Sequence, residues 1–442
     1  MRTPSSRTAR RFPTIPRRSH GWIPSARRSR TTGKCATARS RSACRICRAD
    51  ALENVLDLGV QPLANSFIAP GEVGKPEPRY PLELARCTAC GHVQLSVTVP
   101  PEIMFRNYVY VSGTSETIPA HFAAYAKDVA ERFVPKGGLV VEIGSNDGTL
   151  LRAFDRGAVR VLGVEPARNI AAMANGAGIP TLDEFFGEAI AGEIAAEHGR
   201  ASAIIGNNVV AHIDDLHGLM NGVTTLLEDR GVFVAEFPYL VDLLEKTAYD
   251  TIYHEHLSYF SVRSVDDLAS RHGLHLIDVR RVGVHGGSIR VFISRDGEAS
   301  PDVKKLLRLE EASGLRTGRP LRPFVEAVQR QREDLMRVLG EIRKARHIAG
   351  YGAPAKGNTL LNYCEIDRSV LDFIVDRSPL KHGLLTPGTH IPVEPPERLM
   401  ASDVRDTLLL AWNFADEILR QQDAYRSRGG RFIVPIPSPR VV

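Results

Sequence analysis

The chain has 442 residues, of which 43% are hydrophobic and 24% are charged, with a formal net charge of +6 at pH 7. This length exceeds what one hydrophobic core usually fills, so we expect two or three domains. The composition is that of an ordinary globular protein and excludes a coiled coil, a collagen-like repeat and global disorder, and no apolar stretch is long enough to span a membrane.

The positive charge is concentrated at the N-terminus. Residues 1–43 contain eleven Arg, one Lys and no acid, which leaves 45 basic and 51 acidic residues in the remainder. We expect this tail to be disordered, either as a dispensable extension or as an organelle transit peptide. Because the remainder is acidic on balance, we expect no nucleic-acid partner. The expected location is cytoplasmic.

Four of the six cysteines form two C-x-x-C pairs, which are Cys44 with Cys47 and Cys87 with Cys90. Two such knuckles supply four thiolates, a complete tetrahedral shell for a structural Zn²⁺ ion. The pairs stand further apart than in the usual zinc ribbon, so a hairpin or loop must lie between them. A redox pair and a disulfide are the alternatives, but a redox motif needs only one pair and we expect no secretion signal.

Residues 139–143 read as an apolar strand that runs into a glycine turn and a helical segment from Thr149. This order opens a doubly wound α/β domain, in which a ligand lies at the carboxyl end of the first strand. A second strand, 161–164, ends at an acid placed to grip a ribose diol. Because G-x-G-x-x-G is absent, S-adenosylmethionine fits better than NAD. The expected cofactor contacts are Gly144, Asn146, Asp147, Gly148, Glu165 and Asn207.

Two further strands, 203–206 and 231–236, also end in polar residues. Asn208 and His212 follow the first of them, four residues apart, and would share one face of a helix. The densest polar cluster is 249–259 (YDTIYHEHLSY), which does not match the zincin pattern H-E-x-x-H. Its His254, Glu255 and His256 can hold or move protons near neutral pH, so it is either a solvated loop or a general acid/base site.

The C-terminal third reads as charged helices over 300–343 followed by a second α/β unit that begins at His347. Its glycine turn leads into a helix that has Lys356 and Asn358 near its start. A lysine and a helix N-terminus together suit a diphosphate ligand. The alternative is that the glycines serve only packing and that the lysine is exposed to solvent. Earlier in the chain, Ser288 and Arg290 follow two consecutive glycines. Two interpretations are possible for this segment: a contact with a phosphate group of the ligand, or a β-bulge with a surface arginine.

Six motifs in this order resemble the deoxysugar C-methyltransferases of the mycarose and tetronitrose type. They are C-x-x-C…C-x-x-C-G-H, Y-x-Y-x-S-G-T-S, E-I-G-S-N-D-G, N-N-V-x-A-H-I, Y-H-E-H-x-S-Y-F and H-G-G-S-I-R. The resemblance implies a class I S-adenosylmethionine-dependent methyltransferase (Rossmann-like) core with an N-terminal zinc-binding domain and a C-terminal Rossmann-like α/β domain. The implied substrate is a nucleotide-linked keto-deoxysugar.

The resemblance also implies roles for individual residues. His256 matches the base that takes a proton next to a ketone, and Tyr253 and Glu255 match its neighbours in the active site. His212, with Asn208, matches the group that faces the keto oxygen, and Tyr108 matches a tyrosine that reaches into the pocket. Such chemistry needs a base near neutral pKa and a donor for the developing enolate oxygen; taken alone, Tyr108 would more often be core packing.

The expected organisation is a disordered basic tail (1–43), a zinc-binding domain (44–115), a methyltransferase domain (116–298), a helical linker (299–345) and a C-terminal Rossmann-like domain (346–442). The expected assembly is a monomer or homodimer, with no membrane partner. Two alternatives remain open at this point: methylation of a keto compound that is not a sugar, and a zinc-ribbon scaffold that binds nucleotides without catalysis.

Overall fold

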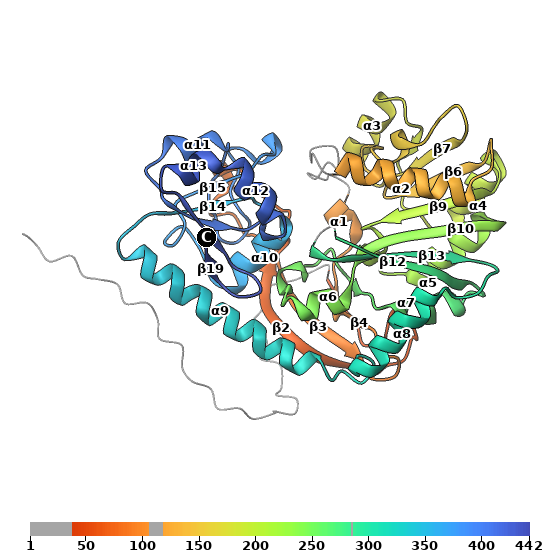
Figure 1. Cartoon of the computed structure of the whole chain (residues 1–442), viewed down its shortest axis with the longest axis horizontal. Coiled ribbons are helices and arrows are strands. Elements are labelled where there is room, and N and C mark those ends of the chain that lie inside the picture. Colours follow the sequence, from red (N-terminus) through yellow and green to blue (C-terminus); the bar gives the residue numbers. More distant parts are fainter. Residues whose placement is uncertain (1–37, 106–117, 284–285) are drawn as a thin grey trace, which may run out of the picture. The chain divides into compact units, whose positions relative to one another are not determined.

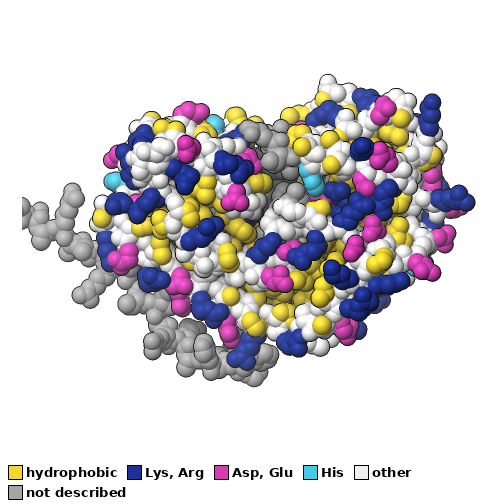
Figure 2. Space-filling view, viewed as in Figure 1, with side chains coloured by type: hydrophobic (Ala, Val, Ile, Leu, Met, Phe, Trp, Pro, Cys, Tyr) yellow, Lys and Arg dark blue, Asp and Glu magenta, His cyan; other side chains and the backbone are white. Residues whose placement is uncertain are grey.

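The computed structural model describes residues 38–105, 118–283 and 286–442 (Figure 1). Tyr108 and residues 1–37 of the basic tail lie outside the described residues. Within the described part, every helix is too short or too polar to cross a bilayer. On the face drawn in Figure 2, Lys and Arg side chains are interspersed with Asp and Glu, so the described residues form no continuous basic surface there.

The N-terminal sheet has four antiparallel strands in the order β11-β4-β3-β2. Its first three strands in the chain are β2 (Leu52–Pro62), β3 (Arg79–Cys87) and β4 (Val93–Leu95). The β2–β3 hairpin fills the separation between the two C-x-x-C pairs, as their spacing predicts. The fourth strand, β11 (Ser258–Tyr259), comes from the polar cluster far along the chain. A short pair, β1 (Arg39–Ser40) with β5 (Val97–Thr98), and the helices η1 (Pro70–Glu72) and α1 (Pro101–Phe105) complete this region.

The central sheet has seven strands in the order β12-β13-β10-β9-β6-β7-β8. They are β6 (Leu139–Ile143), β7 (Arg160–Val164), β8 (Thr181–Leu182), β9 (Ala201–Asn207), β10 (Leu227–Pro238), β12 (His275–Val282) and β13 (Ser288–Ser294). All pairings are parallel except those of β13, which runs antiparallel to both its neighbours. The order reverses between β6 and β9, so a crevice forms outside their carboxyl ends.

Both faces of this sheet are covered, which explains its continuous apolar strands. Alternate residues of β6 enter different cores, with Val141 in one apolar cluster and Val140 in another. The helices of this region are α2 (Ile118–Phe133), α3 (Arg168–Gly176), α4 (Glu188–His198), α5 (Leu216–Leu226), α6 (Leu240–Glu245) and α7 (Val262–Ser270), with the short turns η3 (Leu151–Ala153), η4 (Val210–His212) and η5 (Tyr249–Thr251).

The helix expected from Thr149 is wrong in type, because the structure has only the 3₁₀ turn η3 there. The side chain of Asp155 accepts a hydrogen bond from the backbone N–H of Gly157, which offers the chain a turn in place of a continued helix. The expected helix through Asn208 and His212 is likewise the single 3₁₀ turn η4, preceded by Asn208 at a φ of 52°.

The third sheet has the order β16-β15-β14-β17-β18-β19, which is parallel apart from its last strand. Its strands are β14 (Ile348–Tyr351), β15 (Ile374–Val375), β16 (Val393–Glu394), β17 (Asp406–Leu409), β18 (Arg431–Val434) and β19 (Arg440–Val441). Its helices are α10 (Ala355–Tyr363), α11 (Glu397–Ala401), α12 (Ala415–Gln421) and α13 (Asp423–Ser427), with η7 (Pro379–Lys381) and η8 (Trp412–Phe414). The order again reverses at the first strand, β14.

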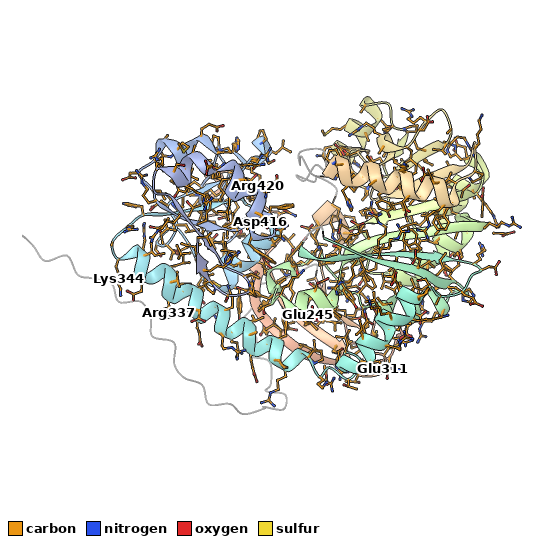
Figure 3. All side chains as sticks on the ribbon, viewed as in Figure 1. Glu245, Glu311, Arg337, Lys344, Asp416 and Arg420 are labelled. Carbon is orange, nitrogen blue, oxygen red and sulfur yellow. The ribbon has the colours of Figure 1, made fainter. Side chains whose placement is uncertain are left out.

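Two helices occupy the segment that the sequence predicts as helical, α8 (Pro301–Ser313) and α9 (Leu321–Arg343). The buried residues of α9 recur every three or four positions and are apolar except for one; they are Leu321, Phe324, Val328, Gln331, Leu335 and Leu339. Charged residues on its other faces, including Arg337, are exposed (Figure 3).

Candidate functional site

A cavity of about 830 Å³ lies at the carboxyl ends of the central and third sheets. Its lining includes Gly144 after β6, Asn207 at the end of β9 and Gly352 after β14. The crevices at the two reversal points of strand order therefore open into the same space. The volume is in the upper range for ligand pockets, so a cofactor and an acceptor can lie side by side.

The four cysteines of the two knuckles come together at the start of the N-terminal sheet. The Sγ atoms of Cys44 and Cys90 are 3.6 Å apart, those of Cys47 and Cys87 are 3.5 Å apart, and all four lie within 4.8 Å of one another. Tetrahedral ligands at the usual Zn–S distance of about 2.3 Å stand roughly 3.8 Å apart, so the cluster fits zinc. The set leaves no open position, so the ion holds the fold and takes no part in the chemistry.

The cofactor end of the cavity is built around the first glycine turn. Gly144 has a φ of 63°, and a Cβ atom there would meet Val209 at 2.8 Å. The carboxylate of Glu165 accepts the backbone N–H groups of Asn146 and Ala167, both at 2.9 Å. Each oxygen of this carboxylate has a lone pair left for a hydroxyl group.

Four of the six predicted cofactor contacts line the cavity, namely Gly144, Asn146, Glu165 and Asn207. The side chain of Asn207 has no hydrogen-bond partner among the described residues, although both its polar atoms are buried. Such atoms call for a polar ligand, since an unpaired buried group is costly. The other two predicted contacts are directed elsewhere, because Asp147 accepts from Thr149 and Gly148 packs against Ile179. Their cofactor roles stay predictions.

An aromatic stack forms the wall between the two ends of the cavity. The ring of His212 stacks on Phe105 with centroids 5.5 Å apart and on His256 at 5.1 Å, and His256 lies 4.0 Å from the ring of Tyr253. All four residues line the cavity. Burial lowers the pKa of His212 to about 4, so its imidazole is neutral at pH 7, and its Nε2 atom has no hydrogen-bond partner among the described residues.

Hydrogen bonds define the tautomer of His256. Its Nδ1 atom lies 2.8 Å from the carbonyl oxygen of Thr251, which can only accept, so Nδ1 carries the hydrogen. Its Nε2 atom lies 2.7 Å from the hydroxyl of Tyr253. In the neutral ring Nε2 is therefore the basic atom, and the Tyr253 hydroxyl donates to it.

The other two members of the Y-H-E-H motif point away from the cavity. Glu255 is buried and accepts a 2.7 Å hydrogen bond from the side chain of Asn65. His254 donates through Nε2 to the carbonyl of Tyr80, and burial lowers its pKa to about 4. The four-residue motif thus divides between cavity and core, because it forms a tight turn in which the N–H of His256 bonds the carbonyl of Tyr253 at 2.8 Å, and only the first and last residues line the cavity.

The third sheet contributes polar groups to the opposite side of the cavity. The Nζ atom of Lys356 and both side-chain polar atoms of Asn413 are buried without a hydrogen-bond partner among the described residues. Burial lowers the pKa of Lys356, and the nearby carboxylate of Asp250 opposes this effect. Asp250 is itself fixed by a 2.6 Å hydrogen bond from the indole of Trp412.

Of the five predicted substrate contacts, Asn208 and Lys356 line the cavity. Ser288 is fully buried on β13, and Asn358 donates to the carbonyl of Ala64 at 2.7 Å. Arg290 forms an ion pair with Glu236 at 2.7 Å. These contacts do not favour a ligand role for Ser288 or Arg290, whereas the buried Oδ1 atom of Asn358 has no hydrogen-bond partner among the described residues. The roles of all three stay predictions.

Several cavity residues escaped the sequence-based prediction. Glu142 lines the cavity with one buried oxygen that has no partner among the described residues, and burial holds its pKa well above its usual range. An acid inside an otherwise apolar strand was a signal for it. Glu236 lies near the end of β10 and Asn413 in η8 after β17, and a polar residue at the end of an apolar run was a signal for both. Asn65 lies in a loop of the N-terminal region, and no pattern marks it.

Family models match nearly the whole folded part of the chain. A zinc binding domain matches residues 44–105, a methyltransferase domain residues 120–279, and a C-methyltransferase C-terminal domain residues 283–437. C-methyltransferase NovU from Streptomyces niveus is 39% identical over 404 residues, which is 90% of this chain and 96% of that protein. The chain therefore belongs to this family of S-adenosylmethionine-dependent C-methyltransferases, and zinc is its structural metal.

Solved structures are similar to a part of the chain. Magnesium protoporphyrin IX methyltransferase (ChlM) from Synechocystis PCC 6803, with bound SAM, is 12% identical, with a TM-score of 0.31 over 42% of this chain and 81% of that chain. The PH0226 protein from Pyrococcus horikoshii OT3 is 14% identical, with a TM-score of 0.35 over 42% of this chain and 95% of that chain.

Proposed function

We propose that the chain methylates a carbon next to the ketone of a nucleotide-linked keto-deoxysugar, with His256 as the general base. The observation that carries this proposal is the distribution of buried polar atoms without partners among the described residues. Asn207 and His212 present them on one side of the cavity, and Lys356 and Asn413 on the other. The cofactor satisfies Asn207, and a keto-sugar whose nucleotide lies at the other side of the cavity satisfies His212, Lys356 and Asn413.

The base is poised by its own hydrogen bonds. With Nδ1–H held by the carbonyl of Thr251, the lone pair of Nε2 in His256 accepts the proton from the substrate carbon once bound substrate has displaced the Tyr253 hydroxyl from it. The C–H electron pair becomes the carbon–carbon double bond, and the carbonyl π electrons move onto the oxygen. The Tyr253 hydroxyl keeps Nε2 directed into the cavity before substrate arrives. The proton leaves the imidazolium to solvent after each turnover.

The developing enolate oxygen needs a donor that is not itself a strong acid. His212 suits this role because burial keeps its ring neutral and its Nε2 atom has no partner among the described residues. A preorganised donor of this kind contributes on the order of 10²–10³-fold to the rate. Bound S-adenosylmethionine supplies an electrophilic methyl group, which the enolate carbon accepts in exchange for release of the thioether.

The nucleotide end is assigned to the third sheet. A diphosphate beside Lys356 replaces the interactions with water that the ammonium group loses on burial. Asn413 has a side-chain donor and a side-chain acceptor at the same edge of the cavity. Glu165 and Asn207 hold the cofactor at the other edge. The two ligands then meet at the aromatic stack formed by Phe105, His212, His256 and Tyr253.

Two assays separate the proton step from methyl transfer. With a nucleotide-linked 4-keto-deoxysugar in D₂O and no cofactor, the wild-type enzyme should exchange the hydrogen next to the ketone, and with labelled S-adenosylmethionine it should transfer label to that carbon. His256→Ala should abolish both while still binding cofactor. Tyr253→Phe, which removes the hydroxyl that donates to Nε2, should slow exchange about tenfold. Exchange that persists in His256→Ala excludes this base, and failure of the wild type to label the sugar excludes the acceptor.

A further inference from the structure

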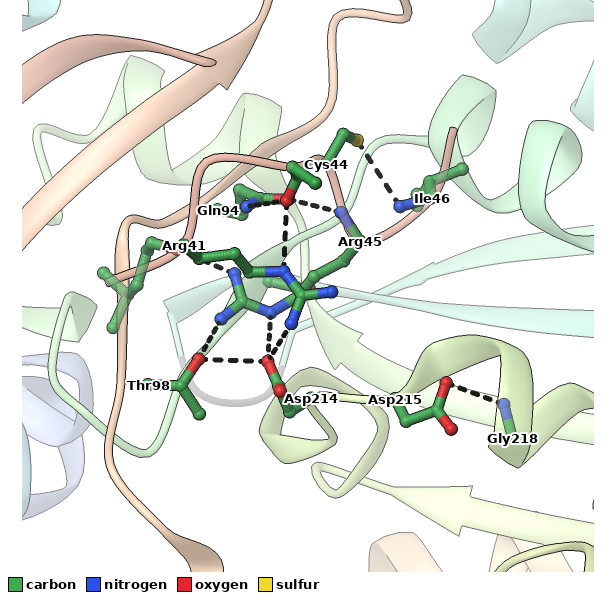
Figure 4. Close-up of polar contacts among 12 residues, drawn as sticks. Arg41, Cys44, Arg45, Ile46, Gln94, Thr98, Asp214, Asp215 and Gly218 are labelled. Carbon is green, nitrogen blue, oxygen red and sulfur yellow. Dashed lines mark hydrogen bonds and ion pairs between the residues drawn. The ribbon is translucent and has the colours of Figure 1, made fainter. Parts of the chain in front are cut away.

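The first knuckle (Cys44–Cys47) is connected to the cavity lining through Arg45, the arginine between its cysteines, which bonds the lining residues Thr98 and Asp214. The side chain of Arg45 is fully buried and donates to three acceptors, which are Asp214 Oδ1 at 3.0 Å, the carbonyl of Leu95 at 2.7 Å and Thr98 Oγ1 at 2.7 Å (Figure 4). Its backbone N–H donates to Gln94 Oε1 at 2.7 Å. A planar guanidinium with fixed N–H directions holds these acceptors in a defined relative position.

One of these acceptors belongs to the segment that carries His212. Asp214 follows His212 by two residues and lines the cavity. Its Oδ1 atom also accepts from Arg41 at 2.8 Å and from Thr98 at 3.0 Å (Figure 4). Three donors therefore hold one oxygen of a side chain that is 38% exposed. The loop after η4 is tied to the zinc-binding region at this point.

The second knuckle (Cys87–Cys90) reaches the other imidazole through the backbone. It leads directly into β4, whose Leu95 N–H donates to the carbonyl of Leu257, the residue after His256, at 3.0 Å. Strand β4 then pairs with β11. The N–H of Leu257 in turn donates to the carbonyl of Ala211 at 2.8 Å, which joins the two histidine segments to each other.

Arg45 contacts both of these connections, because it bonds Leu95 on the His256 side and Asp214 on the His212 side. We propose that Arg45 is a positioning residue through which the zinc knuckles fix the two imidazoles against each other. The proposal rests on the proposed roles of His212 and His256. According to this proposal, the zinc-binding region positions His212 and His256 in addition to stabilising the fold, because its metal would hold the backbone that carries Arg45.

The test compares Arg45→Gln with Arg48→Gln, an exposed arginine after the same knuckle. Both variants should retain one zinc ion per chain and the wild-type affinity for S-adenosylmethionine. Arg45→Gln should lower kcat for label transfer and for hydrogen exchange by roughly 10- to 100-fold, the scale of a misplaced catalytic group, with little change in KM. The imidazole ¹⁵N shifts of His212 and His256 should move in Arg45→Gln and stay in Arg48→Gln. Arg45→Lys should not rescue, because an ammonium cannot span three separate acceptors.

A second variant guards against simple misfolding. Asp214→Asn removes the charge opposite Arg45, so its fold is checked by zinc content and circular dichroism. It should reproduce the loss in kcat, and the double variant should be no worse than either single one. Additive losses, or Arg45→Gln with wild-type exchange and unchanged imidazole shifts, would overturn the proposal. Neither result would touch the base assignment, which fails only if His256→Ala still exchanges.

Discussion

Substitution of Arg290 can show whether this arginine binds a ligand or stabilises the fold. Arg290 stands opposite Glu236 in the antiparallel pairing of β13 with β10, and its Nε and Nη2 atoms lie 2.9 and 2.7 Å from Glu236 Oε2. The guanidinium also lies 3.4 Å from the ring centre of Tyr125. The side chains of Arg290 and Glu236 are only 7% and 2% exposed, so the pair is almost completely desolvated.

Arg290→Met removes the charge but retains most of the volume. Glu236 then remains as a buried carboxylate, and among the described residues its side chain keeps the contact with His121, 3.0 Å away. Breaking one partner of a buried ion pair costs about 3–5 kcal/mol, so the free energy of unfolding should fall by that amount. Burial alone would raise the pKa of Glu236, but the bond from His121 and the charge of Arg290 lower it. Without Arg290 that pKa should rise.

The assay is urea unfolding followed by circular dichroism at pH 7, with Arg230→Met as the control. Arg230 is an exposed residue of β10, and its variant should stay within about 0.5 kcal/mol of wild type. Arg290→Met combined with Glu236→Gln should recover part of the loss, because no unpaired charge is left. If Arg290→Met were as stable as wild type but bound the nucleotide-linked sugar more weakly, the structural account would fail and a phosphate contact would be favoured instead.

Three further outcomes are expected. Lys356→Met should raise KM for the nucleotide-linked sugar roughly 10-fold or more, the effect of losing one charge-assisted hydrogen bond, while cofactor affinity stays unchanged. As a control, substitution of the exposed Lys344 by Met should leave both quantities unchanged (Figure 3). An unaltered KM in Lys356→Met would refute the diphosphate site. Cys47→Ser should lose zinc, measured by elemental mass spectrometry, and unfold at lower temperature, whereas full zinc content would exclude the four-cysteine shell. Burial lowers the pKa of His92 to about 3 and of His254 to about 4. Since the unfolded chain binds more protons below pH 6.5, stability should fall as the pH drops towards 4, by about 2 kcal/mol for each histidine at pH 5. Urea unfolding at pH 7 and pH 5 measures this loss, and equal stability at both would contradict it.

Local chemistry in the sequence predicted much of the fold. A buried parallel strand must be apolar on both faces, so the runs at 139–143 and 203–206 mark β6 and β9 without further information. Two C-x-x-C pairs predict a metal cluster because together they supply the four thiolates of a tetrahedral zinc shell. Polar residues just after apolar strands predict the ligand edge of each sheet, where Asn207 and Glu165 indeed line the cavity.

Side-chain direction and distant pairing were decided only by the tertiary structure. His254 and His256 are two residues apart, yet one enters the core beside Tyr80 and the other the cavity. Arg290 reads as a possible phosphate ligand until the strand register places it opposite Glu236. Arg45 meets Asp214 across 169 positions, and no local pattern connects them. Periodicity specifies which residues are buried, whereas the partner of a buried charge depends on contacts that exist only after distant segments have packed together.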